Sequence, residues 1–169
     1  MPKIKKNIVD IKTSATLAIN ELSHQLEKKG KEIFKFGLGQ SPFPVPKIIV
    51  EELKKNAEQK NYINVSGLID LREQVAKYHS IKNKNNYTAD NVIIGPGSKE
   101  LIFQTQLVID CEVLLPSPSW VSYEPQAQIL NKKIHWIKTD STSNWHVTPD
   151  ELEKKCQSLL QSEKLLILN

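Results

Sequence analysis

The segment Asn91–Glu100, read NVIIGPGSKE, decides the fold. Its apolar residues Val92–Ile94 predict a short strand, Gly-Pro-Gly predicts a turn, and Ser98 opens an amphipathic helix predicted over Lys99–Ile109. The first N–H groups of a helix have no partner within it, and the helix dipole makes this end positive, so such a turn can hold a phosphate. Glycine turns also occur for purely conformational reasons. Both interpretations are open from these residues alone.

The residues after this turn alternate between strand and helix patterns. Strands are predicted over Glu112–Leu115, Lys133–Ile137 and Leu165–Leu168. Helices are predicted over Val121–Leu130 and from a cap at Thr148, with Pro149 at the first helical position, to about Leu160. Strands that alternate with helices are typical of parallel sheets covered by helices. The sequence therefore predicts an α/β fold with a partial, mainly parallel sheet and flanking helices.

The N-terminal part has a different pattern. Helices are predicted over Ser14–Lys29, Pro46–Lys60 and Leu68–Ile81, and a short strand over Glu32–Leu38. In the helix Pro46–Lys60, the residues Ile49, Val50, Leu53 and Ala57 are expected to face inward. The segment from Gly39 to Pro46 contains three prolines, which exclude both a helix and a central strand. It is either a linker between domains or a rigid pocket wall.

Composition excludes several classes of protein. The 169 residues are 39% hydrophobic and 25% charged, with no apolar run of membrane-spanning length and no apolar signal core at the N-terminus. The net charge of +4 comes almost entirely from lysine, because Arg72 is the only arginine. Nucleic-acid surfaces usually concentrate arginine or interleave aromatic and basic residues, so we expect no nucleic-acid partner. Because no apolar run is long enough, we also expect no membrane partner. Two distant cysteines, Cys111 and Cys156, indicate a reduced, cytoplasmic protein.

No set of residues predicts a metal site or a nucleophile. His24, His79, His135 and His146 have no metal-ligand spacing. The glycine turn also fails the nucleotide P-loop and dinucleotide patterns, since Glu100 stands where the latter needs its third glycine.

Two aromatic residues are further candidates for a site. Trp120 lies in Pro116–Tyr123 (PSPSWVSY), after a predicted strand and at the end where open α/β sheets bind ligands. It either stacks on a flat ligand ring or fills the core at a helix start. Tyr62 lies on a loop between two predicted helices, where it is either a hydrogen-bond donor or a surface aromatic residue.

Taken together and in this order, these motifs resemble the N-terminal part of the class I/II aminotransferases, pyridoxal-phosphate enzymes of fold type I of the aspartate-aminotransferase kind. The resemblance covers nearly the whole chain. It depends on four motifs: Gly37–Phe43 (GLGQSPF), Tyr62 with Gly67 and Leu71–Glu73 (LRE), Gly95–Glu100 (GPGSKE), and Pro116–Tyr123. It implies that residues 1–45 are a segment of the small domain with the connecting pocket wall. Residues 46–169 would be an incomplete pyridoxal-phosphate-binding large domain, the first half of the family's sheet.

The resemblance also implies roles for individual residues. Gly97, Ser98 and Lys99 would hold the phosphate of pyridoxal 5'-phosphate, and Trp120 would stack on its pyridine ring. Tyr62 would reach across a homodimer interface to the phosphate of the neighbouring subunit. The backbone of Gly39 would bind the substrate carboxylate.

The resemblance implies transamination between an amino acid and a 2-oxo acid. The family's Asn-Pro-Thr-Gly segment, its aspartate, its Schiff-base lysine and its carboxylate-binding arginine would all lie beyond residue 169. We therefore expect an N-terminal portion without a catalytic residue of its own: Lys99 does not replace the lysine, and Arg72 matches a structural position. Two other interpretations are a non-catalytic remnant and an anion-binding α/β module.

Overall fold

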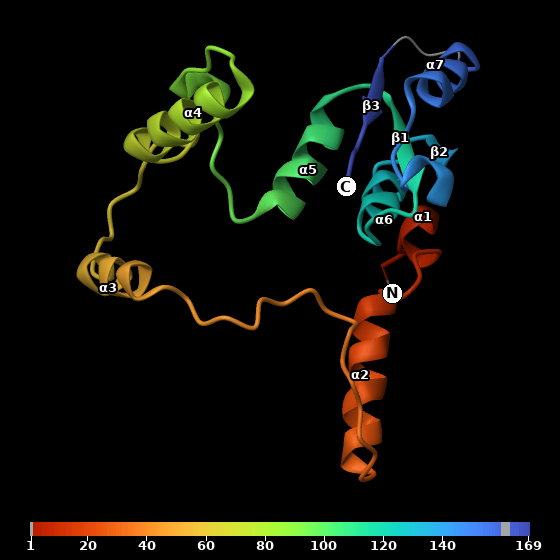
Figure 1. The fold of residues 1–169 in the computed structure, drawn as a ribbon, viewed down its shortest axis with the longest axis horizontal. Helices are drawn as coiled ribbons and strands as arrows, with labels where there is room; N and C mark the ends of the chain where they lie inside the picture. Colours follow the sequence, from red (N-terminus) through yellow and green to blue (C-terminus); the bar gives the residue numbers. More distant parts are fainter. Residues whose placement is uncertain (1, 160–162) are drawn as a thin grey trace. The chain divides into compact units, whose positions relative to one another are not determined.

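The computed structural model describes residues 2–159 and 163–169, and Figure 1 labels its helices and strands. The chain divides into two units. The first, the sheet unit, comprises Met1–Leu38 and Ile102–Asn169. The second, the helical unit, comprises Gly39–Leu101. The boundary between them falls inside one helix, α5 (Ser98–Val108).

The sheet unit contains a three-stranded parallel sheet. Its strands are β1 (Glu112–Ser117), β2 (Ile134–Lys138) and β3 (Lys164–Leu166), in the order β2-β1-β3. Val113 of β1 is in register with Ile134 of β2 and with Leu165 of β3, which puts these three side chains on one face of the sheet. This sheet and its flanking helices confirm the predicted α/β class.

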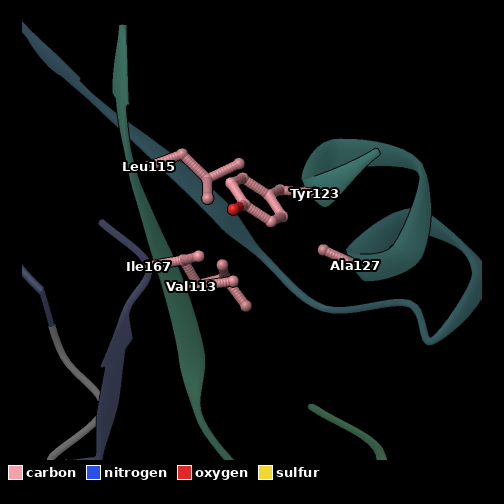
Figure 2. Close-up of a cluster of buried hydrophobic side chains, with 5 residues drawn as sticks. All are labelled: Val113, Leu115, Tyr123, Ala127 and Ile167. Atoms are coloured by element: carbon pink, nitrogen blue, oxygen red, sulfur yellow. The ribbon is translucent and has the colours of Figure 1, made fainter. Parts of the chain in front are cut away.

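The core of the sheet unit lies between β1 and α6 (Tyr123–Ile129). Figure 2 shows Val113 and Leu115 of β1 together with Ile167, facing Tyr123 and Ala127 of α6. Val113, Leu115 and Ala127 are fully buried. β1 pairs with a strand on each side, and α6 packs against one of its faces. The loop after β1 therefore begins at the end of a well-packed strand.

The remaining helices of the sheet unit are α1 (Lys6–Val9), α2 (Ala15–Lys28), the 3-10 turn Ser141–Ser143 and α7 (Pro149–Gln157). No residue of α2 is buried. The predicted end of the last helix, Leu160, lies outside the described residues. None of the helices within residues 2–159 and 163–169 is both long and apolar enough to cross a bilayer.

The start of α7 is stabilised by Thr148, as its sequence predicts. The Thr148 hydroxyl accepts a hydrogen bond from Glu151 N–H at 3.3 Å, and the Glu151 carboxylate accepts one from Thr148 N–H at 3.2 Å. We expect Thr148→Ala to lower the free energy of unfolding by about 1 kcal/mol, since the helix loses this cap. Urea unfolding followed by circular dichroism measures the change, and Thr13→Ala, at an exposed position outside the helices, is the control. An unchanged midpoint would show that the cap contributes nothing.

The helical unit contains α3 (Lys47–Asn56), α4 (Ile69–Asn83), the 3-10 turn Ala89–Asn91 and the first turn of α5. Two predictions about α3 are wrong. The helix ends at Asn56 rather than Lys60, and none of its residues is buried. Leu53, which was expected to face inward, is 70% exposed, because the described part of this unit places no apolar partner over that face.

Two predicted strands are also absent. Neither Glu32–Leu38 nor Val92–Ile94 pairs with a strand in the part of the chain that the structure describes. Phe36 is 92% exposed, so the apolar pattern of the first segment has nothing to pack against. The second segment leads from extended backbone at Val92 to Ile94, whose N–H donates to Ser66 O at 2.9 Å. An apolar run forms a strand only where a neighbouring strand is available.

Candidate functional site

The glycine turn that precedes α5 uses its two glycines for different reasons. At Gly95 an added Cβ would lie 2.7 Å from Cδ2 of Leu101, so a side chain there would have to displace the end of the Leu101 side chain. Gly97 has φ +118°, a conformation that residues with a side chain rarely adopt. An added Cβ there would meet nothing within 4 Å, so the space beside Gly97 is open.

The N-terminal end of α5 follows directly after Gly97. Gly97, Ser98 and Lys99 are all exposed. The first N–H groups of a helix have no partner within it, and the helix dipole adds positive potential. The Ser98 hydroxyl supplies a further donor, and the Lys99 ammonium group carries a positive charge. An exposed hydroxyl, a helix start and an open glycine turn suit a phosphate group, so these residues fit the phosphate of the implied cofactor.

The loop that carries Tyr62 contacts Ile94, the residue that precedes the turn. Ile94 N–H donates a hydrogen bond to Ser66 O at 2.9 Å. Gly67 has φ +101°, and an added Cβ there would lie 2.6 Å from Cβ of Ile94. Sequence reasoning missed this contact between Ser66–Gly67 and Ile94. The glycine in Val-Ser-Gly was the one signal that could have suggested it.

Arg72, a residue of α4, binds the segment that precedes the glycine turn. Its Nε donates to Val92 O at 2.9 Å and its Nη2 donates to Ala89 O at 2.7 Å. The Arg72 side chain is buried, whereas Asp90, 3.6 Å from Nη2, is 97% exposed and contributes little. The expected structural role of Arg72 is confirmed.

Tyr62 and Gly39 lie at open positions of the helical unit. The Tyr62 side chain is fully exposed, so its hydroxyl is accessible to a molecule outside this unit. An added Cβ at Gly39 would meet nothing within 4 Å. Both predicted roles stay predictions.

Trp120 lies in the sheet unit, in the loop that follows β1. Its ring packs edge-to-face on Tyr123, with centroids 5.3 Å apart and an interplanar angle of 78°. Tyr123 is buried in the core, while Trp120 is 38% exposed. The tryptophan therefore packs on the core, as one of its two interpretations expects, and part of its surface is still exposed. Its stacking on a ligand ring stays a prediction.

A pocket of about 460 Å³ lies beside Trp120 within the sheet unit. Its walls come from the N-terminal residues 10, 12–15, from α6 and from Trp136 of β2. Asn7 fixes the N-terminal segment there, since its Nδ2 donates to Gln128 O at 3.1 Å and to Ile129 O at 2.9 Å. Sequence analysis missed this wall, because a single asparagine in a lysine-rich segment gives no signal of a partner so distant along the chain.

The described residues outside this site include a cysteine and a histidine whose surroundings do not indicate a catalytic role. Burial raises the pKa of the Cys111 thiol, which keeps it protonated and unreactive. His135 Nε2 lies 3.1 Å from the buried carboxylate of Glu112. Within residues 2–159 and 163–169 no group of histidine, cysteine, aspartate and glutamate residues could hold a metal ion.

The sequence model of the family "Aminotransferase class I and II" matches residues 31–169. The chain belongs to this family. The match includes the glycine turn, the Tyr62 loop, Arg72 and Trp120, and it confirms the resemblance on which their roles depend.

Individual aminotransferases support the same assignment. The chain is 28% identical over 172 residues to the aspartate aminotransferase of Geobacillus stearothermophilus, covering 99% of this chain and 43% of that protein. It is 27% identical over 155 residues to the aspartate aminotransferase of Thermotoga maritima, covering 89% of this chain and 41% of that protein. The chain thus spans less than half the length of these relatives.

The fold agrees with solved aminotransferase structures. The aspartate aminotransferase from Thermus thermophilus superposes with a TM-score of 0.86 at 23% identity, over 100% of this chain and 45% of that one. At this identity the likeness shows the fold. The structure brings together Gly97, Ser98 and Lys99 in the helical unit, and it anchors Trp120 in the sheet unit.

Proposed function

We propose that this chain is the N-terminal, pyridoxal-phosphate-binding part of an aminotransferase that transfers an amino group between an amino acid and a 2-oxo acid. The observation that carries the proposal is the start of α5. There Gly97, at φ +118° and beside open space, precedes an exposed Ser98 and Lys99 in a segment that the family model covers. This arrangement combines the donors and the charge that a phosphate monoester needs.

In the proposed site each residue contributes one kind of interaction. The N–H groups at Gly97 and Ser98 and the Ser98 hydroxyl donate hydrogen bonds to the phosphate, and Lys99 supplies a positive charge. Trp120 packs against one face of the pyridine ring and excludes water from it. When bound, pyridoxal phosphate supplies an electron-accepting ring system for chemistry at the α-carbon of the amino acid.

Substrate binding and the second subunit complete the proposed site. The Gly39 backbone binds the substrate carboxylate, and the exposed Tyr62 hydroxyl donates to the cofactor phosphate of a neighbouring subunit in a homodimer. None of the lysines in residues 1–169 is proposed to bind the cofactor covalently, so turnover depends on a lysine outside these residues. We place the enzyme in cytoplasmic amino acid metabolism, with residues 1–45 contributing to a small domain and 46–169 to a large domain.

The test is cofactor binding by the whole chain, measured by equilibrium dialysis with pyridoxal 5'-phosphate and with pyridoxal. We expect Ser98→Ala to weaken binding of the phosphorylated compound about tenfold, since one charge-assisted hydrogen bond is lost, and to leave pyridoxal binding unchanged. Trp120→Ala should weaken the binding of both compounds, because both contain the pyridine ring. Trp145→Ala, at an exposed position of the sheet unit, is the matched control.

Two outcomes would contradict the proposal. Wild-type chain that bound neither compound would exclude the cofactor role. Binding that depended on Ser98 but not on Trp120 would instead favour the anion-binding module, which needs the start of α5 and no ring contact.

A further inference from the structure

We propose that the loop Asn61–Gly67, which carries Tyr62, is mechanically coupled to the phosphate turn Gly95–Ser98. Binding of a phosphate monoester at the turn would then set the position of the tyrosine loop. The inference rests on the proposed cofactor site and goes beyond it, because it assigns positioning roles to Gly67 and Ile94, which do not touch the phosphate.

The coupling depends on direct contact between backbone segments. Ile94 N–H donates to Ser66 O at 2.9 Å. An added Cβ at Gly67 would lie 2.6 Å from Cβ and 2.8 Å from Cγ1 of Ile94. No flexible side chain separates the loop from the residue that leads into the turn. Close-packed groups of this kind transmit displacement instead of absorbing it.

The loop side of this contact is held by two local hydrogen bonds. Ser66 N–H donates to Asn64 Oδ1 at 2.9 Å, and Gly67 N–H donates to Asn64 O at 2.9 Å. An asparagine that bonds the backbone two residues ahead closes a tight turn. Tyr62 lies two residues before Asn64, so only Ile63 separates the tyrosine from this turn along the chain.

On the Ile94 side, a short segment connects the contact to α5. From Ile94 the chain passes Gly95, where an added Cβ would lie 2.7 Å from Leu101 of α5. It then passes Gly97 at φ +118° and enters the helix at Ser98. A shift of the first turn of α5 therefore reaches Ile94 within four residues.

The coupling has a consequence for the proposed homodimer. If Tyr62 serves the neighbouring subunit, then cofactor bound to one subunit positions the tyrosine that the other subunit uses. The two cofactor sites would then bind with positive cooperativity, since occupation of the first removes the cost of ordering the tyrosine for the second.

The test uses Gly67→Ala, whose added Cβ must displace Ile94. Its control is Gly30→Ala, because Gly30 also has a positive φ (+77°) and has no atom within 4 Å of an added Cβ. We expect Gly67→Ala to bind pyridoxal 5'-phosphate about fivefold to tenfold more weakly and to bind pyridoxal as wild type does. In hydrogen–deuterium exchange, added pyridoxal 5'-phosphate should slow exchange at residues 62–67 in wild type and in Gly30→Ala, but not in Gly67→Ala.

Each other result has a definite meaning. If a folded Gly67→Ala bound pyridoxal 5'-phosphate as wild type does, with the same protection of residues 62–67, the coupling would be refuted while the proposed function stood. If wild-type chain bound no pyridoxal 5'-phosphate, the proposed function and the coupling would fail together. A uniform loss for both compounds would show a merely structural effect and would also refute the coupling.

A second, milder variant covers the case in which Gly67→Ala does not fold. Asn64→Ala removes the side-chain acceptor of Ser66 N–H and adds no atom to the contact. We expect about threefold weaker binding of pyridoxal 5'-phosphate, with pyridoxal unaffected. The matched control is Asn61→Ala in the same loop, whose side chain has no hydrogen bond among the described residues. Equal affinity of the two variants would refute the coupling.

Discussion

Leu115→Ala is expected to destabilise the sheet unit by about 3 kcal/mol. Leu115 is fully buried on β1, and its side chain faces Tyr123 of α6 (Figure 2). Removal of its outer carbon atoms leaves a cavity between the sheet and the helix, which costs both transfer free energy and packing. Urea unfolding should show a midpoint about 1 to 2 M lower than that of wild type.

The same substitution should change the surroundings of Trp120. The ring of Trp120 packs on Tyr123, which would lose its contact with Leu115. In a background with Phe at Trp136 and Trp145, the fluorescence emission of Trp120 should therefore shift to longer wavelength in the folded state. This would link the core of the sheet unit to the residue proposed to contact the cofactor ring.

Two controls isolate the cause. Leu115→Met keeps the volume and should cost less than about 1.5 kcal/mol. Leu107→Ala removes the same atoms from an exposed position of α5 and should change stability by less than about 0.5 kcal/mol. A Leu115→Ala midpoint equal to that of Leu107→Ala would mean that this cluster is not the core of the unit.

Local patterns in the sequence predicted the sheet unit well. The apolar run at Glu112–Leu115 became β1, and the Thr148 cap with Pro149 became the start of α7. Each of these signals depends on residues that are close along the chain. A strand that is buried on both faces and a helix with its own cap need no information about distant partners.

The features that could not be predicted depend on distant partners. The segment Val92–Ile94 has the composition of a strand, but its described neighbour is the loop at Ser66, not another strand. Asn7 reaches carbonyl groups more than 120 residues away, at Gln128 and Ile129. Nothing in the sequence near an asparagine indicates such a partner, so only the fold reveals it.

The glycines make the same point for the candidate site. Gly97 has a positive φ and open space beside it, Gly67 has a positive φ and no room for a Cβ beside Ile94, and Gly95 lies close to the Leu101 side chain. The sequence alone does not show which of these requirements applies to a given glycine. The glycine turn and the helix that follows it could be predicted because their signals are local in the sequence, and the support of the turn from the Tyr62 loop could not.

The second large effect is expected at Arg72, which holds the segment that leads into the turn. Arg72→Met should lower the free energy of unfolding of the helical unit by about 2 to 4 kcal/mol, because two charge-assisted hydrogen bonds to Val92 O and Ala89 O are lost. A carbonyl group whose donor is removed must find water, which loosens the Ala89–Val92 segment. Hydrogen–deuterium exchange at residues 89–97 should become faster in this variant.

Three further variants separate the hydrogen bonds of Arg72 from its charge. Arg72→Lys keeps the charge but presents one ammonium group to two carbonyl groups, so it should recover less than half of the loss. Asp90→Asn removes the exposed ion pair and should change stability by less than about 0.5 kcal/mol. Lys77→Met, at an exposed position of α4, controls for loss of a positive charge on the same helix.

The effect of Arg72 on ligand binding follows from the same contacts. Arg72 and the Ser66–Gly67 contact hold neighbouring positions, Val92 and Ile94, from α4 and from the loop before it. If the phosphate turn needs both supports, Arg72→Met should weaken pyridoxal 5'-phosphate binding about tenfold, with pyridoxal little affected. Combined with Gly67→Ala, the loss should be smaller than the product of the two single losses, because both variants release the same segment. Losses that simply multiplied would mean that the two supports act independently and that the turn is not held as one piece.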